Sequence, residues 1–183
     1  MGPNQRRQVL TVVVICLAGV SVLGQGGRVV NQAGSSGWRV DFNGDGTIDS
    51  CQIVGTPGYS SLACNVTGSA RPVDSGRIDL GYPEGRAFVD FDGDRKSDFC
   101  RVVGNSPKQA FLRCTLSEGS ASGTTISSDA LDAGTPESRQ WRDVNGDGKA
   151  DFCRVLGTYQ PLLNCTFSLG RSGFGKTVVS KRY

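Results

Sequence analysis

The chain has 183 residues, including 26 glycines and no histidine, and its formal net charge at pH 7 is +3. This length suffices for one domain with a hydrophobic core. The absence of histidine excludes Ser-His-Asp and Cys-His catalysis as well as histidine-ligated zinc. The basic residues are dispersed along the chain, so the sequence gives no indication of a nucleic-acid partner.

The N-terminal stretch predicts a secreted protein. Two arginines precede an apolar run from Val9 to Leu23, after which small and polar residues begin, an order typical of a secretory signal. We expect cleavage after Gly24, so that residues 1–24 are the signal and residues 25–183 form one extracellular domain. The apolar run is shorter than the roughly 20 residues of a spanning helix, which favours a cleaved signal, and we predict no membrane span after cleavage. An uncleaved signal anchor is the alternative.

The remainder of the chain divides into three repeats, at about 38–86, 87–139 and 140–183. Residues 25–37 precede the repeats as a linker. Within this linker, Gly27 to Asn31 could form a strand that pairs with the last repeat and closes the array. A frayed N-terminal tail is the alternative.

Each repeat has the pattern of a strand, an acidic loop, two short strands that meet at a turn, and a weaker fourth segment. The fourth segments are Gly76 to Leu80, Thr124 to Ser127 and Lys176 to Ser180. Little of the sequence has helical period. We therefore predict an all-β fold of three four-stranded antiparallel units that are similar to propeller blades. Three blades cannot readily close a ring, so we favour a single compact array, monomeric, over a homodimer of six blades or an open stack.

The acidic loops carry the chemistry of a calcium site. In each loop, oxygen-bearing side chains stand at positions 1, 3, 5 and 9, and the carbonyl of position 7 can complete the set. Ca²⁺ takes about six to eight oxygens at roughly 2.3–2.6 Å in loose geometry. We therefore predict about one Ca²⁺ per repeat. The predicted ligands are Asp41, Asn43, Asp45, Thr47 and Asp49 in the first loop, Asp90, Asp92, Asp94, Lys96 and Asp98 in the second, and Asp143, Asn145, Asp147, Lys149 and Asp151 in the third.

These loops do not have the pattern of EF-hands. An EF-hand needs a bidentate glutamate at position 12 and a helix on either side. Position 12 is instead Gln52, Arg101 or Arg154, and the flanking residues are predicted strands. The loops therefore belong to a calcium-binding type that is flanked by strands.

The pattern Asp-x-(Asp/Asn)-x-Asp-Gly-x-x-Asp, followed by a hydrophobic strand such as Phe152 to Gly157, resembles FG-GAP and VCBS-type repeats. These are the calcium-bearing blades of integrin-alpha-like β-propellers and of several secreted lectins. The resemblance covers about residues 38–170, and it implies a blade fold with a structural Ca²⁺ in each blade. Because the family serves adhesion, glycan binding and accessory roles on enzymes, the resemblance implies no single activity.

The second loop departs from the other two at one position. It has Arg95 where they have Gly46 and Gly148, and a side chain resists the backbone turn that glycine permits. The positive charge of Arg95 also opposes a cation, although Asp92 adds a fourth carboxylate that we expect to compensate. The alternative is a loop held by Asx-turn hydrogen bonds without metal.

The cysteines predict disulfides. One of seven, Cys16, lies in the predicted signal, and the other six fall two to a repeat on either side of a predicted turn. An even number of cysteines in a secreted chain indicates disulfides. We predict the pairs Cys51–Cys64, Cys100–Cys114 and Cys153–Cys165. Two sequons predict N-glycosylation at Asn65 and Asn164.

Three aromatic residues precede the loops, at positions that we take as equivalent: Trp38, Phe88 and Trp141. We favour the interpretation that they form a repeated part of the core. A platform on which sugars stack is the alternative.

These features predict a binding protein and not an enzyme. We favour a secreted, calcium-stabilised module that recognises extracellular glycans or proteins, with any sugar bound in grooves between blades. A structural or adhesion repeat protein without sugar binding is the alternative. An accessory part of a carbohydrate-active enzyme has the least support, because most carboxylates fall within the calcium pattern and the others have no spacing that pairs them.

Overall fold

The computed structural model describes residues 37–56 and 58–180. The predicted signal and the strand predicted within residues 27–31 lie outside this part of the chain. The helices of the described part are short 3-10 turns, namely η1 (Pro107–Gln109), η2 (Pro136–Ser138) and η3 (Gly170–Ser172). None of them is long or apolar enough to cross a membrane.

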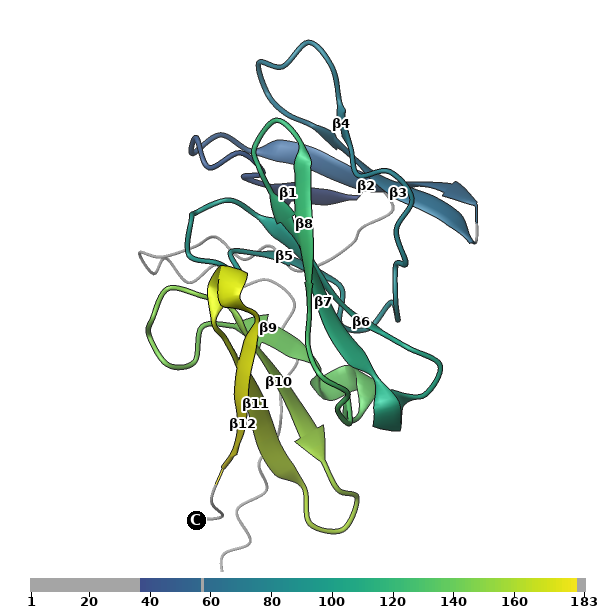
Figure 1. Ribbon diagram of the computed structural model, residues 1–183, viewed down its shortest axis with the longest axis vertical. Helices are drawn as coiled ribbons and strands as arrows, with labels where there is room; N and C mark the ends of the chain where they lie inside the picture. Colours follow the sequence, from purple (N-terminus) through teal and green to yellow (C-terminus); the bar gives the residue numbers. More distant parts are fainter. Residues whose placement is uncertain (1–36, 57, 181–183) are drawn as a thin grey trace, which may run out of the picture.

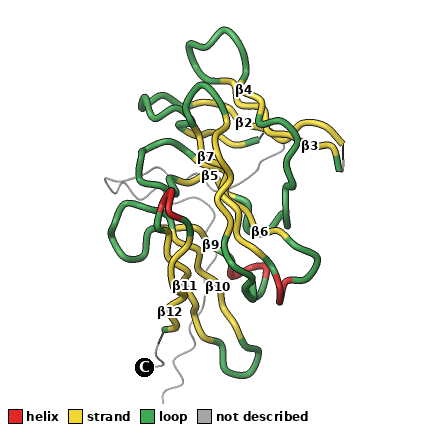
Figure 2. The backbone as a smooth tube through the Cα atoms, viewed as in Figure 1, coloured by secondary structure: helices red, strands yellow, loops and turns green. Residues whose placement is uncertain are grey.

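Each repeat forms one four-stranded antiparallel sheet whose strands lie side by side in chain order (Figures 1 and 2). An acidic loop joins the first and second strands of every sheet. The first sheet contains β1 (Trp38–Val40), β2 (Asp49–Thr56), β3 (Tyr59–Asn65) and β4 (Val73–Asp74). The second contains β5 (Ala87–Val89), β6 (Asp98–Val103), β7 (Phe111–Ser117) and β8 (Ser122–Ser127). The third contains β9 (Gln140–Arg142), β10 (Asp151–Leu156), β11 (Leu162–Ser168) and β12 (Phe174–Val179).

The predicted all-β fold of three four-stranded units is confirmed, and the described residues form no closed ring. The sheets follow one another along the long axis of the molecule in chain order (Figure 1). Every strand pairs with a strand of its own repeat. Pairing of neighbours in sequence therefore builds each unit, and side-chain packing joins the units.

The three predicted disulfides are confirmed, and each joins the two central strands of a sheet. The partner cysteines lie directly opposite each other in the register, with Cα–Cα distances of 4.0, 4.0 and 4.1 Å. In an antiparallel pair, the closest opposed positions are those without mutual hydrogen bonds. The spacing around each turn places both cysteines at such a position, on the same face of their sheet.

The fourth strand predicted at Gly76 to Leu80 is wrong. The fourth strand of the first sheet is the two-residue β4, which pairs with Ala63 and Cys64. After it, the carboxylate of Asp74 accepts a hydrogen bond from the N–H of Gly76 at 2.7 Å, a turn that interrupts the strand, although the N–H of Ile78 still donates to the carbonyl of Ser60 in β3 at 3.0 Å. The corresponding prediction in the second repeat falls within β8, and the one in the third lies in β12 apart from its last residue, Ser180.

The core lies between the sheets and forms two clusters of buried side chains. We name the two sides of each sheet after their roles. The receiving face carries the disulfide, and in the second repeat it includes Val89 and Phe91. The inserting face carries the aromatic pair of each later repeat, which is Phe88 and Phe99 in the second. The inserting face of one repeat packs on the receiving face of the repeat before it.

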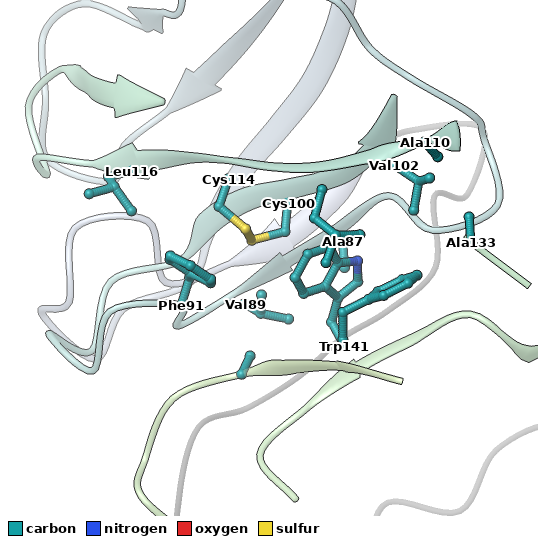
Figure 3. Close-up of a cluster of buried hydrophobic side chains, with 13 residues drawn as sticks. Ala87, Val89, Phe91, Cys100, Val102, Ala110, Cys114, Leu116, Ala133 and Trp141 are labelled. Carbon is teal, nitrogen blue, oxygen red and sulfur yellow. A yellow bond between two sulfur atoms is a disulfide. The ribbon is translucent and has the colours of Figure 1, made fainter. Parts of the chain in front are cut away.

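The two inter-repeat contacts are built alike. In the first, Phe88 and Phe99 pack against the receiving face of the first sheet. In the second, Trp141 and Phe152, whose ring centroids are 4.9 Å apart, pack against the receiving face of the second sheet. Figure 3 shows Trp141 pointing toward the second sheet, near Ala87, with the Cys100–Cys114 disulfide among the cluster residues.

The aromatic residues before the loops are core residues, but the proposed equivalence of Trp38 is wrong. Trp38 is three residues before its loop, whereas Phe88 and Trp141 are two residues before theirs. Successive strand residues point to opposite faces, so Trp38 lies on a receiving face. Its ring contacts Phe88 of the next repeat with centroids 5.5 Å apart. All three side chains are buried, which excludes them as a sugar-stacking platform.

The two outer faces of the array are more polar than the inner ones. The inserting face of the first repeat has Arg39 and Ser50 where the later repeats have aromatic pairs. The receiving face of the third repeat has Gln140 and Arg142 in place of apolar residues, and both are exposed. Terminal repeats of an array need a polar outer face because nothing covers them. The first and third repeats thus have the pattern of caps.

Candidate metal centres

The first residue of each loop organises the turn that follows it. One carboxylate oxygen of Asp41 accepts hydrogen bonds from the N–H groups of Gly44 and Asp45, and the other accepts one from Gly46. Asp90 and Asp143 make the same kind of bonds in their loops. The same hydrogen bonds recur in all three loops although their sequences differ, which indicates that the Asp at position 1 sets the path of the loop.

The last aspartate of each loop ties the loop to a distant strand. Asp98 is fully buried. One of its oxygens accepts the N–H of Phe91 at 2.9 Å and the other accepts the N–H of Ser117, at the end of β7, at 2.8 Å. Asp49 and Asp151 bridge equivalent groups in the first and third repeats. Position 9 therefore has a structural role in every repeat, whether or not a cation is bound.

The loops also join neighbouring repeats. The carbonyl of Asp41 accepts the N–H of Ser97 in the next loop at 3.0 Å, and the carbonyl of Asp90 accepts the N–H of Ala150 at 2.8 Å. The hydroxyl of Ser117 donates to the carbonyl of Phe42 at 2.5 Å, and the hydroxyl of Ser168 makes the equivalent bond across the second contact. A change in the conformation of a loop would therefore alter the hydrogen bonds that join neighbouring repeats.

The second loop brings three of its predicted ligands together. Asp90, Asp92 and Asp98 each offer one oxygen, and these oxygens lie within 4.8 Å of one another. Among the described residues, this is the one group of three or more acidic or cysteine side chains that converges in this way. The side chain of Asp92 is 3% exposed, and its Oδ2 accepts no hydrogen bond, although Nε of Arg171 lies 2.9 Å from it. Three converging carboxylate oxygens are the ligands that a hard cation prefers, so the residues present fit Ca²⁺.

The electrostatics of the second loop favour a cation. Burial raises the pKa of Asp90, Asp92 and Asp98, the last to about 8, and nearby carboxylates raise these pKa values further. Burial also acts to raise the pKa of Asp94, but hydrogen bonds from Lys96 outweigh it and the pKa falls. A divalent cation among these groups would stabilise their charged forms.

The fifth residue of each loop pairs with a side chain of its own loop. The ammonium of Lys96 contacts the carboxylate of Asp94, and Lys149 Nζ lies 3.0 Å from Asp147 Oδ2. In the first loop, the amide of Asn43 donates to Asp45 at 2.8 Å. We predicted position 7 as a backbone ligand only, so the ion pairs made by its lysines are a feature that the sequence interpretation missed.

Arg95 adopts the backbone conformation that the glycines of the other loops adopt. Its φ is 70°, and it is the one described residue other than glycine with a positive φ. Gly46 and Gly148 have φ values of 84° and 82° at the same place. A side chain in this region costs about 1–3 kcal/mol. The second loop bears this cost. The N–H of Arg95 still donates to the carboxylate of Asp90, so arginine in place of glycine leaves the turn intact.

The two predicted glycosylation residues lie in different environments. Asn65 ends β3 and is exposed. Asn164 is buried, and the amide nitrogen that would carry a glycan donates to the carbonyl of Leu162 at 3.0 Å. In this fold, only Asn65 of the two presents its side chain to solvent.

A groove of about 760 Å³ lies where the first repeat meets the segment that leads to the second. Its walls combine aliphatic and charged side chains, including Ile53, Ile78, Leu80, Arg77, Asp79 and Arg86. The guanidinium of Arg77 lies 4.5 Å from the centroid of the Tyr59 ring, which is 72% exposed. In the second repeat, η1 is bonded to the segment that leads to the third repeat, since the carbonyl of Pro107 accepts the N–H of Ala133 at 2.7 Å. The size of the groove is typical of a ligand site.

Pairs of arginines hold the segments that connect the repeats. Arg101 is buried and its Nε donates to the carbonyl of Asp79, while Arg86 donates to the carbonyls of Leu80 and Gly81. The next connecting segment is held in the same way by Arg154 and Arg139. These bonds fix one wall of the groove, because the connecting segment is part of it.

Comparison with models of known protein families gave no match, and no curated protein or solved structure was found to be similar to the chain.

Proposed function

We propose that the chain is a secreted, calcium-stabilised binding module that recognises an extracellular ligand through the groove beside its first repeat. One observation carries the proposal: the loops that gather carboxylates are also the segments that join the repeats. The cluster of Asp90, Asp92 and Asp98 and the bond from Ala150 to the carbonyl of Asp90 belong to the same loop. A cation that orders the loop would therefore order the contact between repeats.

The chemistry of the loops supports Ca²⁺ as the cation. All predicted side-chain ligands are carboxylate or amide oxygens, which suit a hard cation. Bound Ca²⁺ would neutralise the clustered carboxylates of the loop. The carboxylate at position 1 would keep its hydrogen bonds to the loop N–H groups, and the carboxylate at position 9 would keep the loop attached to the end of β7 or β11 or, in the first repeat, to Thr67 just after β3. Three disulfides favour an oxidising compartment, which supports secretion.

Calcium should raise the thermal stability of the protein, because ligands that bind only the folded state stabilise it by mass action. At 1 mM Ca²⁺ and a dissociation constant near 10 μM, each site contributes about 2.7 kcal/mol. We expect a rise in Tm of about 10 °C or more over the chelated protein, measured by scanning calorimetry. Native mass spectrometry should show three Ca²⁺ per chain.

Magnesium at equal concentration is the control for this measurement, because it demands a smaller and stricter geometry. An equal rise in Tm with Mg²⁺ would indicate general charge screening. A Tm that is the same in calcium and in chelator would contradict the proposal and leave the loops as turns held by their own hydrogen bonds.

We favour a glycan as the ligand, on the composition of the groove. Arg77, one of its wall residues, lies beside the exposed ring of Tyr59, and the walls offer both aliphatic surface and fixed polar groups. Sites of this kind bury the apolar face of a ligand and orient it through a few polar contacts. An adhesion protein without sugar binding is the second candidate, since Tyr and Arg also dominate protein interfaces.

Tyr59→Ala and Arg77→Ala should weaken glycan binding by at least about tenfold each, the loss expected for residues that carry an interface. The measurement is a glycan array in the presence of calcium, followed by titration of any sugar that binds. Asp129→Asn, on an exposed residue outside the groove and the loops, is the control. An array without signal would count against the glycan, and capture of one extracellular protein without sugar competition would favour adhesion.

A further inference from the structure

The carboxylates of the second loop face a cation that comes from the third repeat. Nε of Arg171, in η3, lies 2.9 Å from Oδ2 of Asp92, and a terminal nitrogen lies 3.7 Å from Oδ2 of Asp94. The same guanidinium contacts Glu118 of the second repeat at 3.1 Å. The N–H of Nε does not point at the Asp92 oxygen, which therefore accepts no hydrogen bond. Arg171 offsets the negative charge of the acidic group, but it does not supply the hydrogen bond that Asp92 Oδ2 lacks.

This arrangement occurs at the second loop and not at the first. Gly119 and Gly170 mark equivalent places, because each lies against position 3 of the preceding loop, namely Asn43 and Asp92. The residue that follows is Ser120 in the second repeat and Arg171 in the third. The loop with the extra carboxylate is thus the loop that meets an arginine. The charge of Asp92 is matched by Arg171, and it does not give the second loop a surplus of negative charge.

We propose that Arg171 lowers the affinity of the second loop for a divalent cation. Because Arg171 belongs to the third repeat, it also couples cation binding at this loop to the docking of the third repeat. The inference rests on the proposed calcium binding. In the cation-free protein, Arg171 relieves the repulsion among Asp90, Asp92 and Asp94 and so holds η3 against the loop. A divalent cation brings the same relief, and it is repelled by the guanidinium. The two positive groups compete for one acidic cluster.

Arg171→Ser, which installs the residue found in the second repeat, should bind Ca²⁺ about tenfold more tightly at the second loop. This is the effect of removing one charge about 6 Å from a divalent ion in a water-like dielectric. The readout is a calcium titration followed by the backbone amide signals of the three loops in NMR spectra of the full secreted chain. In the variant, the signals of residues 90–98 should saturate at a lower calcium concentration than in the unchanged protein. The signals of residues 41–49 and 143–151 should saturate at the same calcium concentration in both proteins.

Arg171→Lys retains the charge and should bind calcium as the unchanged protein does. Lys176 is an exposed residue of the same repeat, and it forms no ion pair among the described residues. Lys176→Ser should therefore leave the calcium affinity of the second loop unchanged. In chelator, Arg171→Ser should lower the Tm, because the ion pair is lost.

An affinity at the second loop that is unchanged or weaker in Arg171→Ser would overturn the inference, even if all three loops bind calcium. A lower Tm in chelator and in calcium alike, without tighter binding, would show that Arg171 only joins two repeats. Failure of all three loops to bind calcium in the unchanged protein would be a failure of the proposed function, and the amide signals distinguish that case.

Discussion

Trp141→Ala is expected to lower the free energy of unfolding by about 3–5 kcal/mol, the usual cost of removing a large buried aromatic side chain. The ring is 3% exposed and packs against Phe152 and Phe174, with centroids 4.9 and 6.3 Å away. Its Nε1 donates to the carbonyl of Gly85 at 2.8 Å, so the substitution also leaves a backbone acceptor without a partner. Guanidinium unfolding followed by circular dichroism measures the loss.

The location of Trp141 predicts which part of the protein fails first. The side chain belongs to the third repeat, and it inserts into the receiving face of the second. Its removal should detach the third repeat while the contact between the first two remains. The transition should therefore become broader or split in two, as in other repeat arrays. Tyr59→Ala is the matched control: its ring is 72% exposed, and we expect a change within about 0.5 kcal/mol. A similar cost at both positions would contradict the assignment of the core.

Asp98→Asn should destabilise the protein by about 2–4 kcal/mol and abolish calcium binding at the second loop. Above the Asp98 pKa of about 8, both carboxylate oxygens accept the N–H groups of Phe91 and Ser117, whereas an asparagine offers one acceptor and one donor. One buried N–H would lose its acceptor, which costs about 1–3 kcal/mol, and the loss of a cation ligand adds to this in calcium. Thermal unfolding with and without calcium, together with native mass spectrometry, gives both effects.

The comparison between calcium and chelator separates the two roles of Asp98. If the residue both bridges the strands and holds a cation, the variant should be less stable than the unchanged protein in chelator, and the difference should grow in calcium. Stability equal to that of the unchanged protein in chelator would show that the hydrogen bonds contribute little. Asp129→Asn removes a charge from an exposed aspartate outside the loops, so it should change neither the stability nor the number of bound ions.

The contacts within a repeat were predictable from the sequence because they join residues that are close along the chain. The disulfides follow from cysteines at fixed places around a turn, and the strands follow from the patterns before and after each loop. Contacts between repeats were not predictable in this way. The bond from Ser117 to Phe42 and the ion pair from Arg171 to Asp92 join residues more than seventy positions apart that no periodicity relates. The groove beside the first repeat could be expected only in general terms, because the part of its wall from Arg77 to Leu80 lies in the segment that was predicted as a fourth strand.

The error at Trp38 shows how sensitive such predictions are to register. A shift of one residue relative to Phe88 moves a side chain to the other face of the strand, so the two rings meet across a contact instead of repeating on one face. The error at Gly76 to Leu80 has a different cause. This segment contains Ile78 and Leu80, which resemble strand residues, but its carbonyls are occupied by arginine side chains from β6 and from the residue before β5. Such bonds compete with pairing to β3 and cannot be read from local propensity.

The second repeat is the one unit of the array with apolar residues on both faces, since Phe88 and Phe99 serve one contact and Val89 and Phe91 serve the other. Because of this asymmetry, the number of repeats in the array can be changed. The inserting face of a duplicate of residues 87–139, placed after the original, would pack on the receiving face of the original. The receiving face of the duplicate would then pack against the inserting face of the following repeat. The polar end units would then terminate a longer protein as they terminate this one, and the number of loops and of contacts between repeats would rise together.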